Sequence, residues 1–145
     1  MMLDIDHFKS VNDTFGHDVG DQVLKLVSHG MQQQIRTVDI LGRLGGEEFA
    51  IALPETDLDT ALSIAERIRL TVQSFSLETD QGHVAFTISI GLANLTNANE
   101  ANEQLIKQAD ELLYRAKQNG RNRVELESAL LKVVPVRKSL SREGS

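Results

Sequence analysis

The sequence has 145 residues, of which 41% are hydrophobic and 25% charged, with a formal net charge of −6. This length suits one folded domain, and the absence of cysteine excludes disulfides and thiolate metal sites. No apolar run approaches the ~20 residues of a membrane-spanning helix, and the acidic balance argues against binding to nucleic-acid backbones. We therefore expect a cytoplasmic protein that has neither a nucleic-acid nor a membrane partner.

The first strand is predicted to end at Ile5, with Asp4 and Asp6 on one face, because side chains alternate along a strand. Apolar residues at helical spacing follow, and they predict two helices, over 8–15 and 18–35. A glycine ends the first of these helices, as glycine commonly does. The chain is therefore expected to begin with a strand and a pair of helices.

A β-hairpin over 38–53 is predicted next, because two apolar runs flank Gly45 and Gly46. Glycine accepts the positive φ angles of tight turns, and its lack of a side chain lets a phosphate approach the backbone. Glu47 and Glu48 follow directly. Two adjacent carboxylates raise each other's pKa, a cost that a bound cation would remove. An acidic, solvated turn is the alternative for this string taken alone.

A third helix is predicted over 58–72, with Thr56 and Asp57 as candidate N-caps. The run 84–93 is rich in β-branched and apolar residues, which is typical of a central strand. These elements continue the alternation of helices with strands that began at the N-terminus.

The last helix is predicted over 102–119, followed by a short strand over 122–126. Helices that alternate with strands, together with a hairpin, predict an α+β fold whose antiparallel or mixed sheet is covered by helices on one face. We expect one domain over 1–126. The remaining residues, 127–145, are mostly polar and are predicted to form a disordered tail.

Several short motifs accompany the Gly-Gly-Glu-Glu-Phe stretch at 45–49. They are Asp4-Ile-Asp-His-Phe-Lys9, Asn12-Asp13-Thr-Phe-Gly-His17, Gly20-Asp21, Arg36-Thr-Val-Asp39, Ser89-Ile-Gly91, Ala109-Asp, Tyr114-Arg-Ala-Lys117 and Gly120-Arg121-Asn122. In these motifs the chain resembles the GGDEF-domain diguanylate cyclases, with the signature loop in its GGEEF form. The resemblance extends from Met2 to about Val124.

The resemblance implies a palm-like fold with a mainly antiparallel sheet, related to other nucleotidyl-transfer enzymes. It also implies an activity, the condensation of two GTP molecules into cyclic di-GMP with release of two pyrophosphates, dependent on Mg²⁺ or Mn²⁺. Since one domain binds one GTP, the family works as a homodimer, which need not be stable. An upstream sensory or regulatory domain is expected in the full-length protein.

Asp4 ends one predicted strand and Glu47 begins another. If these strands are neighbours, their backbones lie ~4.8 Å apart, and the two carboxylates can bind Mg²⁺, which prefers oxygen ligands. The resemblance assigns metal ligation to both residues, assisted by the backbone carbonyl of Ile5. For Glu48 three roles stay open: a ligand of a second metal, a group that helps to deprotonate a ribose hydroxyl, or a loop charge.

The turn from Ile5 to Phe8 leads from a strand into a helix, so its free N–H groups can hold phosphate oxygens. Lys9 adds a positive charge there, and Lys117 and Arg121 lie four residues apart around the end of the last helix. In the family, residues at these positions bind the triphosphate, and Gly45 and Gly46 lie beside the substrate. The alternative for Lys117 and Arg121 is a structural one, because basic residues are favoured at helix C-termini.

Asn12 and Asp21 correspond to the residues that bind the guanine base in the family. A carboxylate can accept two hydrogen bonds from the N1–H and N2–H₂ groups of guanine, whereas adenine presents an acceptor at N1. An amide offers both a donor and an acceptor. Without the resemblance, these residues would be interpreted as a polar helix residue and a helix N-cap.

Arg36 and Asp39 form an RxxD sequence nine residues before Gly45. The resemblance implies a product-inhibition site here, in which arginine binds guanine or phosphate of cyclic di-GMP and the aspartate contacts the base edge. Arg67, on the neighbouring predicted helix, is a candidate second arm of this site. A surface ion pair is the alternative.

A second function stays open: a catalytically weak or silent module that binds GTP or cyclic di-GMP. The family's domain normally begins further upstream, with a helix and the start of the first strand, and this sequence begins just before Asp4. We therefore expect the chain, as given, to turn over slowly and to expose apolar surface on its sheet.

Overall fold

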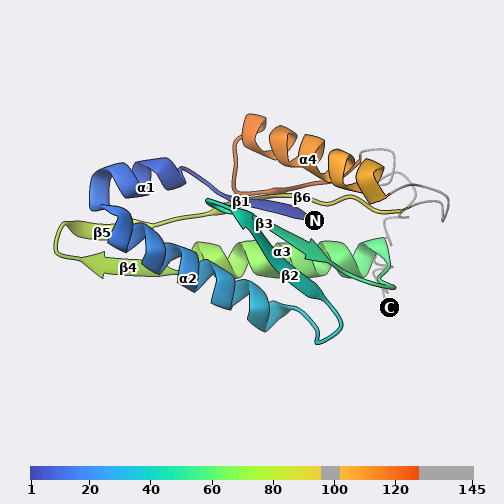
Figure 1. Ribbon diagram of the computed structural model, residues 1–145, viewed down its shortest axis with the longest axis horizontal. Coiled ribbons are helices and arrows are strands. Elements are labelled where there is room, and N and C mark those ends of the chain that lie inside the picture. The colour runs from blue at the N-terminus through green and yellow to red at the C-terminus, as the bar shows by residue number, and fades with distance from the viewer. Residues whose placement is uncertain (96–101, 128–145) are drawn as a thin grey trace, which may run out of the picture.

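The computed structural model describes residues 1–95 and 102–127 (Figure 1). In chain order the elements are β1 (Met2–Ile5), α1 (Phe8–Phe15), α2 (His17–Gln34), β2 (Ile40–Gly45), β3 (Glu48–Ala52), α3 (Leu58–Ser74), β4 (Ser76–Thr79), β5 (Gly82–Ala85), β6 (Ile88–Gly91), α4 (Asn102–Gln118) and β7 (Val124–Glu125). Most of the predicted tail, residues 128–145, lies outside the described residues. The domain boundary therefore stays a prediction.

Five strands form the main sheet, in the order β2-β3-β1-β6-β7. Strand β1 lies at its centre and pairs antiparallel with both β3 and β6. Only the short β7, within the described part of the chain, pairs in parallel, with β6. The predicted α+β fold with a mainly antiparallel sheet is therefore confirmed.

Helices cover both faces of this sheet, because β1 is apolar on both of its faces. Leu3 packs in the large core cluster with residues of α2 and α3. Its neighbour Met2 points the other way and packs against Ala109 and Leu113 of α4. Figure 1 shows α4 on one side of the strands and α2 and α3 on the other. The prediction that helices cover one face only is therefore wrong.

The predicted strand over 84–93 is divided between two sheets. Val84 and Ala85 belong to β5, which pairs with β4 in a separate two-stranded sheet, and Ile88 begins β6 of the main sheet. Strand β4 was not predicted. Phe86, which lies between β5 and β6, is also buried in the core. The sequence therefore stays apolar across this boundary, and hydrophobicity alone does not show where one strand ends and the next begins.

The helix boundaries follow the predicted signals closely. Asp57 is the N-cap of α3, and its side chain accepts a 2.7 Å hydrogen bond from the Thr60 N–H. Thr56, the other candidate, donates instead to the carbonyl of Pro54. No helix in the described residues is both long enough and apolar enough to span a bilayer.

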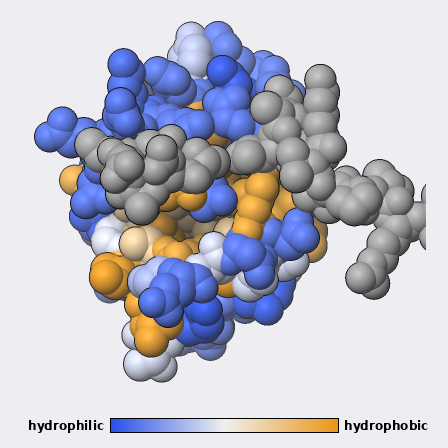
Figure 2. Space-filling model, turned by 90° about the vertical axis from the view of Figure 1, so that its right-hand side faces the viewer, coloured by the Kyte–Doolittle hydropathy of each residue, from blue (hydrophilic) through white to orange (hydrophobic). Residues whose placement is uncertain are grey.

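Apolar surface is exposed at the sheet edge formed by β2. Ile40, in this strand, is 64% exposed, and Val38, just before it, is 62% exposed. Figure 2 shows the end of the molecule that lies on the right in Figure 1, where apolar surface gathers across the middle between hydrophilic regions. This edge is a different surface from the uncovered sheet face on which an apolar patch was expected, so that expectation stays a prediction.

Candidate active site

A small cavity of about 170 Å³ opens where β1 ends, beside the hairpin turn and the end of α4. It is lined by Asp4, Ile5, Asp6, His7, Phe8, Lys9, Glu47, Lys117 and Arg121. Most of the residues predicted to hold the metal and the phosphates therefore lie around one cavity, although they come from both ends of the chain.

Asp4 is one of two buried carboxylates in the lining of this cavity, with 5% of the residue exposed. Burial raises the pKa of its carboxyl group above the usual value, and the nearby Glu47 and Glu48 raise it further. Lys117 acts in the opposite direction, because its ammonium group lies 2.5 Å from Asp4 Oδ2. Negative charge is thus concentrated at this point, and one lysine offsets part of it.

Strands β1 and β3 are neighbours, as the metal-site prediction required. Asp4 lies opposite Glu48 in the register, and the Ile5 N–H donates to the Glu47 carbonyl at 3.3 Å. Glu47 lines the cavity. Glu48 is exposed on β3 and is not among the lining residues, so its three candidate roles stay open.

The turn that carries these acids depends on its two glycines. Gly45 has a φ of 147° and Gly46 a φ of 52°, and the register shifts between Arg43 and Gly45. A side chain on either glycine would meet no atom within 4 Å, so the space beside them is open to a ligand. Arg43 fixes the turn, because its Nε–H donates to the Gly46 carbonyl at 2.9 Å.

The predicted phosphate-binding residues converge from two helices. Lys9 lies in the first turn of α1 and Lys117 in the last turn of α4, while Arg121 follows α4 in a tight turn with a φ of 62°. All three line the cavity. Three positive charges thus surround a space whose floor is acidic, an arrangement suited to a metal-bound polyphosphate.

The packing of α1 against α2 places Asn12 beside Gly20, the residue before Asp21. Asn12 Oδ1 is buried and accepts no hydrogen bond from the described residues. It lies against Gly20, the neighbour of Asp21, and a Cβ atom at Gly20 would be only 1.9 Å from Asn12 Oδ1. Glycine is therefore required there. A buried acceptor without a partner is costly, and this oxygen is closed off from solvent by its packing against Gly20.

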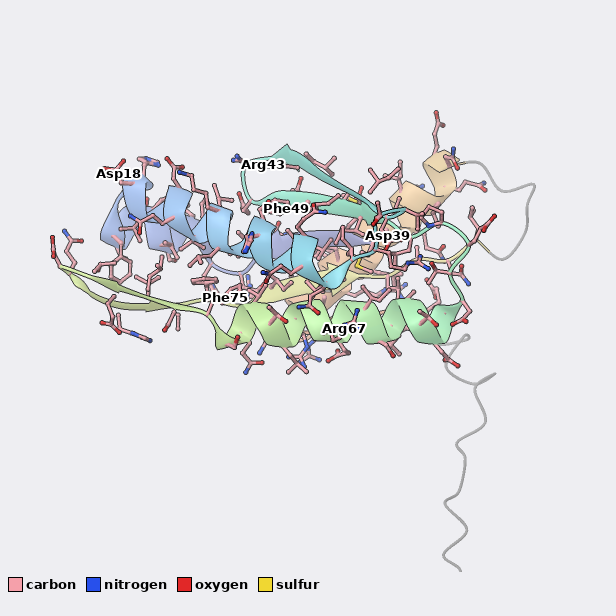
Figure 3. The ribbon with its side chains drawn as sticks, turned by 90° about the horizontal axis from the view of Figure 1, so that it is seen from below. Asp18, Asp39, Arg43, Phe49, Arg67 and Phe75 are labelled. Carbon is pink, nitrogen blue, oxygen red and sulfur yellow. The ribbon has the colours of Figure 1, made fainter. Side chains whose placement is uncertain are left out.

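Asp21 also lines a larger groove of about 660 Å³ between α2 and the hairpin. Its other lining residues are Leu24, Lys25, Ser28, His29, Gln32, Leu41, Arg43 and Phe49. Figure 3 shows Arg43 and Phe49 on the hairpin, beside α2. This groove combines an apolar wall with a few polar groups, as nucleotide and other small-molecule sites do.

Arg36 and Asp39 form an ion pair with an N–O distance of 2.8 Å, and Asp39 also accepts a hydrogen bond from the Arg36 backbone N–H. The Arg36 guanidinium holds the pKa of Asp39 below its usual value. Arg67 lies on α3 and donates to the carbonyl of Gln34, at the end of α2. Figure 3 shows Arg67 on α3 and Asp39 in the loop between α2 and β2. The ion-pair alternative is thus present, and it leaves the inhibitory role a prediction.

The acidic residues fit a divalent cation that a substrate helps to hold. Within 1–95 and 102–127, no cluster of three or more His, Cys, Asp or Glu side chains could hold a metal ion without other ligands. Mg²⁺ is usually bound by one or two carboxylates together with substrate phosphates and water. Asp4 and Glu47, with the carbonyl of Ile5, would supply the protein ligands of such a site.

Two residues were missed by the sequence interpretation. Asp6 is buried and accepts hydrogen bonds from Thr87, Ser89 and the Asn122 backbone. Its alternation with Asp4 was the available signal, but a carboxylate that binds other parts of the protein cannot be told from a ligand-binding one by sequence. The role of Arg43 in fixing the turn could not be predicted from sequence, because its hydrogen-bond acceptor is a backbone carbonyl, which every residue has.

Comparison with known proteins identifies relatives along nearly the whole described chain. The sequence model described as "Diguanylate cyclase, GGDEF domain" matches residues 1–123. The uncharacterized protein YhcK of Bacillus subtilis is 49% identical over 123 residues, which are 84% of this chain and 34% of that protein. Diguanylate cyclase DgcM of Escherichia coli K12 is 46% identical over 124 residues, 86% of this chain and 29% of DgcM.

A solved structure with a similar fold carries the same domain name. The GGDEF domain of DgcB from Caulobacter crescentus, solved in complex with c-di-GMP, superposes with a TM-score of 0.82 at 37% identity. The superposition covers 86% of this chain and 74% of that one. The chain spans about a third of the length of the curated relatives that it matches. Sequence and fold together place it in the GGDEF-domain family of diguanylate cyclases.

Proposed function

We propose that this chain condenses two molecules of GTP into cyclic di-GMP and releases two pyrophosphates. The observation that carries the proposal is the cavity in which Asp4 and Glu47 lie with Lys117 and Arg121. Paired carboxylates beside two bases are what a metal-bound triphosphate requires. The kinship with diguanylate cyclases such as DgcM supports the same reaction.

Asp4, Glu47 and the Ile5 carbonyl would hold the divalent cation. When bound, this cation would stabilise negative charge on the attacking and leaving oxygens. The chain's own bases act on the other end of the triphosphate: Lys117 and Arg121 bind the β- and γ-phosphates and stabilise the pyrophosphate as it leaves. The first N–H groups of α1 add donors, because a helix N-terminus binds anions.

The bond changes are the same in each half of the reaction. The 3′-oxygen of one GTP attacks the α-phosphorus of the other, the bond from that phosphorus to the bridging oxygen breaks, and pyrophosphate departs. A carboxylate must take the proton of the 3′-hydroxyl group. Glu48, exposed on β3 next to the cavity residue Glu47, is the candidate. Two such steps close the ring.

Guanine would be recognised where α1 packs on α2. Asp21 accepts from N1–H and N2–H₂ of the base, and the Asn12 amide, which offers both a donor and an acceptor, would contact the base as well. Adenine has no donor at N1. We therefore propose GTP, and not ATP, as the substrate.

Each chain would supply one GTP, so the reaction requires two chains whose cavities face each other. A homodimer, stable or transient, follows from this stoichiometry. The product would then bind at a second place, where Arg36, Asp39 and Arg67 contact its phosphate and guanine groups. The c-di-GMP complex of the DgcB GGDEF domain supports product binding by a related domain.

The test is to incubate the purified chain with GTP and Mg²⁺ and to quantify cyclic di-GMP by chromatography and pyrophosphate by a coupled assay. The expected result is two pyrophosphates per cyclic dinucleotide, no product with ATP, and a rate that rises more steeply than linearly with protein concentration. Absence of product over a wide range of protein concentration, with GTP still bound, would overturn the proposal. It would favour the alternative, a module that binds nucleotides without turnover.

A further inference from the structure

Asp6 is a buried carboxylate to which the proposed reaction gives no role. Only 6% of the residue is exposed, and its Oδ1 accepts from the Ser89 hydroxyl at 2.6 Å. Its Oδ2 accepts from the Thr87 hydroxyl at 2.7 Å and from the Asn122 backbone N–H at 3.0 Å. The carboxylate therefore connects the end of β1 to β6 and to the turn that follows α4.

This turn has an unfavourable backbone conformation. Gly120, Arg121 and Asn122 have φ angles of 121°, 62° and 46°. Positive φ angles are disfavoured for residues with a side chain, and they persist only where the surroundings impose them. Part of the constraint is local, because the Arg121 N–H donates to the Ala116 carbonyl at 2.9 Å. The Arg123 side chain adds a second local hydrogen bond, to the Arg121 carbonyl at 3.2 Å, and further contacts come from outside the turn.

Two such contacts hold Asn122. Asp6 accepts from its backbone N–H, and Arg69 of α3 donates to its side-chain Oδ1 at 3.0 Å. Arg69 is itself fixed by an ion pair with Glu66 at 2.8 Å. Both contacts can be charge-assisted, because Arg69 is a cation and Asp6 is an anion when ionised. Of the two, only Asp6 acts on the Asn122 backbone.

We infer that Asp6 is a positioning residue that holds the 120–122 turn in the conformation which directs Arg121 into the cavity. The inference rests on the proposed function, because it gives Arg121 the task of binding phosphate. Asp6 lies two residues after Asp4, so the same short segment supplies a proposed metal ligand and fixes the arginine that binds the other end of the triphosphate. Asp6 thereby helps to fix the distance between the proposed metal ligand Asp4 and the proposed phosphate-binding residue Arg121.

The first test needs no nucleotide. In Asp6→Ala, the Asn122 amide loses its acceptor, and its hydrogen exchange, followed by NMR, is expected to accelerate by about tenfold or more. Asp80→Ala removes an exposed acid in the β4–β5 turn and is the matched control, which should leave that amide unchanged. Unchanged exchange at Asn122 in folded Asp6→Ala would overturn the inference.

The second test measures the affinity for a nonhydrolysable GTP analogue with Mg²⁺, by calorimetry, in Asp6→Ala, Arg121→Ala and the double variant. Asp6→Ala is expected to weaken binding about tenfold, and to cost nothing further once Arg121 is absent. Parent-like affinity of Asp6→Ala, or losses that add fully in the double variant, would overturn the inference. Failure of the parent to bind the analogue would instead refute the proposed function, and the exchange test would still decide the role of Asp6.

Two further variants separate positioning from folding. Asp6→Asn is expected to restore most of the affinity, because its amide oxygen can accept from Asn122 while its NH₂ group donates to the Ser89 hydroxyl. If Asp6→Ala does not fold, Thr87→Val with Ser89→Ala removes the hydroxyls that orient the carboxylate. That variant should raise the exchange at Asn122 in the same direction, and unaltered exchange would count against the inference.

Discussion

Lys117 and Asp4 form an ion pair of 2.5 Å in the cavity. The carboxylate proposed to bind the metal is thus already paired with the lysine proposed to bind phosphate. Both proposed roles require this contact to open, because a divalent cation would take over the charge of Asp4. Metal binding and release of Lys117 towards the triphosphate are therefore coupled.

The coupling predicts opposite effects of Lys117→Met on two ligands. Without nucleotide, the affinity for Mn²⁺ should rise several-fold, since no ammonium group competes for Asp4, while the affinity for GTP with Mg²⁺ should fall about tenfold. Electron paramagnetic resonance of Mn²⁺ and calorimetry with a GTP analogue measure these changes. Lys107→Met, an exposed lysine on the same helix, is the control. A Mn²⁺ affinity that stays level or drops would contradict the coupling.

The adjacent acids Glu47 and Glu48 should differ in their importance for binding. Glu47 lines the cavity and Glu48 does not, so Glu47→Gln should abolish the Mg²⁺-dependent part of GTP binding, whereas Glu48→Gln should bind GTP normally. If Glu48 takes the ribose proton, its amide variant should lose turnover while keeping affinity. Calorimetry with and without Mg²⁺ measures the first effect, and pyrophosphate release the second. Unchanged Mg²⁺-dependent binding by Glu47→Gln would remove this residue from the metal site.

The buried Asp4 should make folding stability dependent on pH. Because burial raises its pKa above 3.8, the folded chain binds the proton more tightly than the unfolded chain does. The free energy of unfolding therefore falls as pH rises from 3.8 through the folded pKa, and this contribution is constant above it. Urea unfolding from about pH 4 to about pH 8 should show the parent losing stability relative to Asp4→Asn. A difference that does not vary with pH would refute this assignment, and Asp80→Asn controls for surface charge.

The close packing at Gly20 predicts that one methyl group disables guanine recognition. In Gly20→Ala the new Cβ would overlap Asn12 Oδ1 and displace the amide, so GTP affinity should fall about tenfold. Gly30→Ala is a matched control in the same helix, because its Cβ would press on the Phe75 ring, away from the cavity residues. Calorimetry and thermal melts should show weaker binding for the first and lower stability without weaker binding for the second. Equal GTP affinities of Gly20→Ala and the parent would exclude Asn12 from the base site.

The RxxD pair predicts product binding that depends on Arg36. Loss of its guanidinium should weaken cyclic di-GMP binding at least several-fold, because losing a bidentate contact costs ~1–3 kcal/mol. Arg67→Ala should weaken it in the same direction, and Arg115→Ala, an exposed arginine on α4, should not. Isothermal titration with cyclic di-GMP distinguishes a product-binding site from a surface ion pair. Equal dissociation constants for Arg36→Ala and the parent would leave only the ion pair with Asp39.

Local signals predicted most elements, because each has a cause within a few residues. Asp57 caps α3 with its own side chain, and Gly45 and Gly46 adopt the positive φ angles that the hairpin requires. The two-stranded sheet of β4 and β5 was missed for the opposite reason. The apolar run over 84–93 pairs first with β4 and then, from Ile88, with β1. The point at which the pairing changes is set by the tertiary structure and not by the local sequence.

In the candidate site, too, local features could be predicted from sequence, whereas features that depend on packing between elements could not. Asp4 and Glu47 can lie close together only if β1 and β3 are adjacent in the sheet, as they are. The residues alone did not predict this adjacency, and the motif resemblance implied it. The buried, unpartnered oxygen of Asn12 and the hydrogen bonds of Asp6 depend on packing between elements. Sequence showed which side chains carry chemistry, but not which of them are directed inward to support others.

The distance along the chain between Asp4 and Lys117 has a consequence for synthesis. These partners are 113 residues apart, and Asp6 and Asn122 are 116 apart. A ribosome adds about 5–20 residues per second, so roughly 6–23 s separate the appearance of the two sides of the cavity. During that interval the nascent chain has its acidic side exposed without the lysine and arginine that complete it. If Lys117 and Arg121 bind the triphosphate as proposed, a chain released before α4 is made would bind nucleotide more weakly than a finished one.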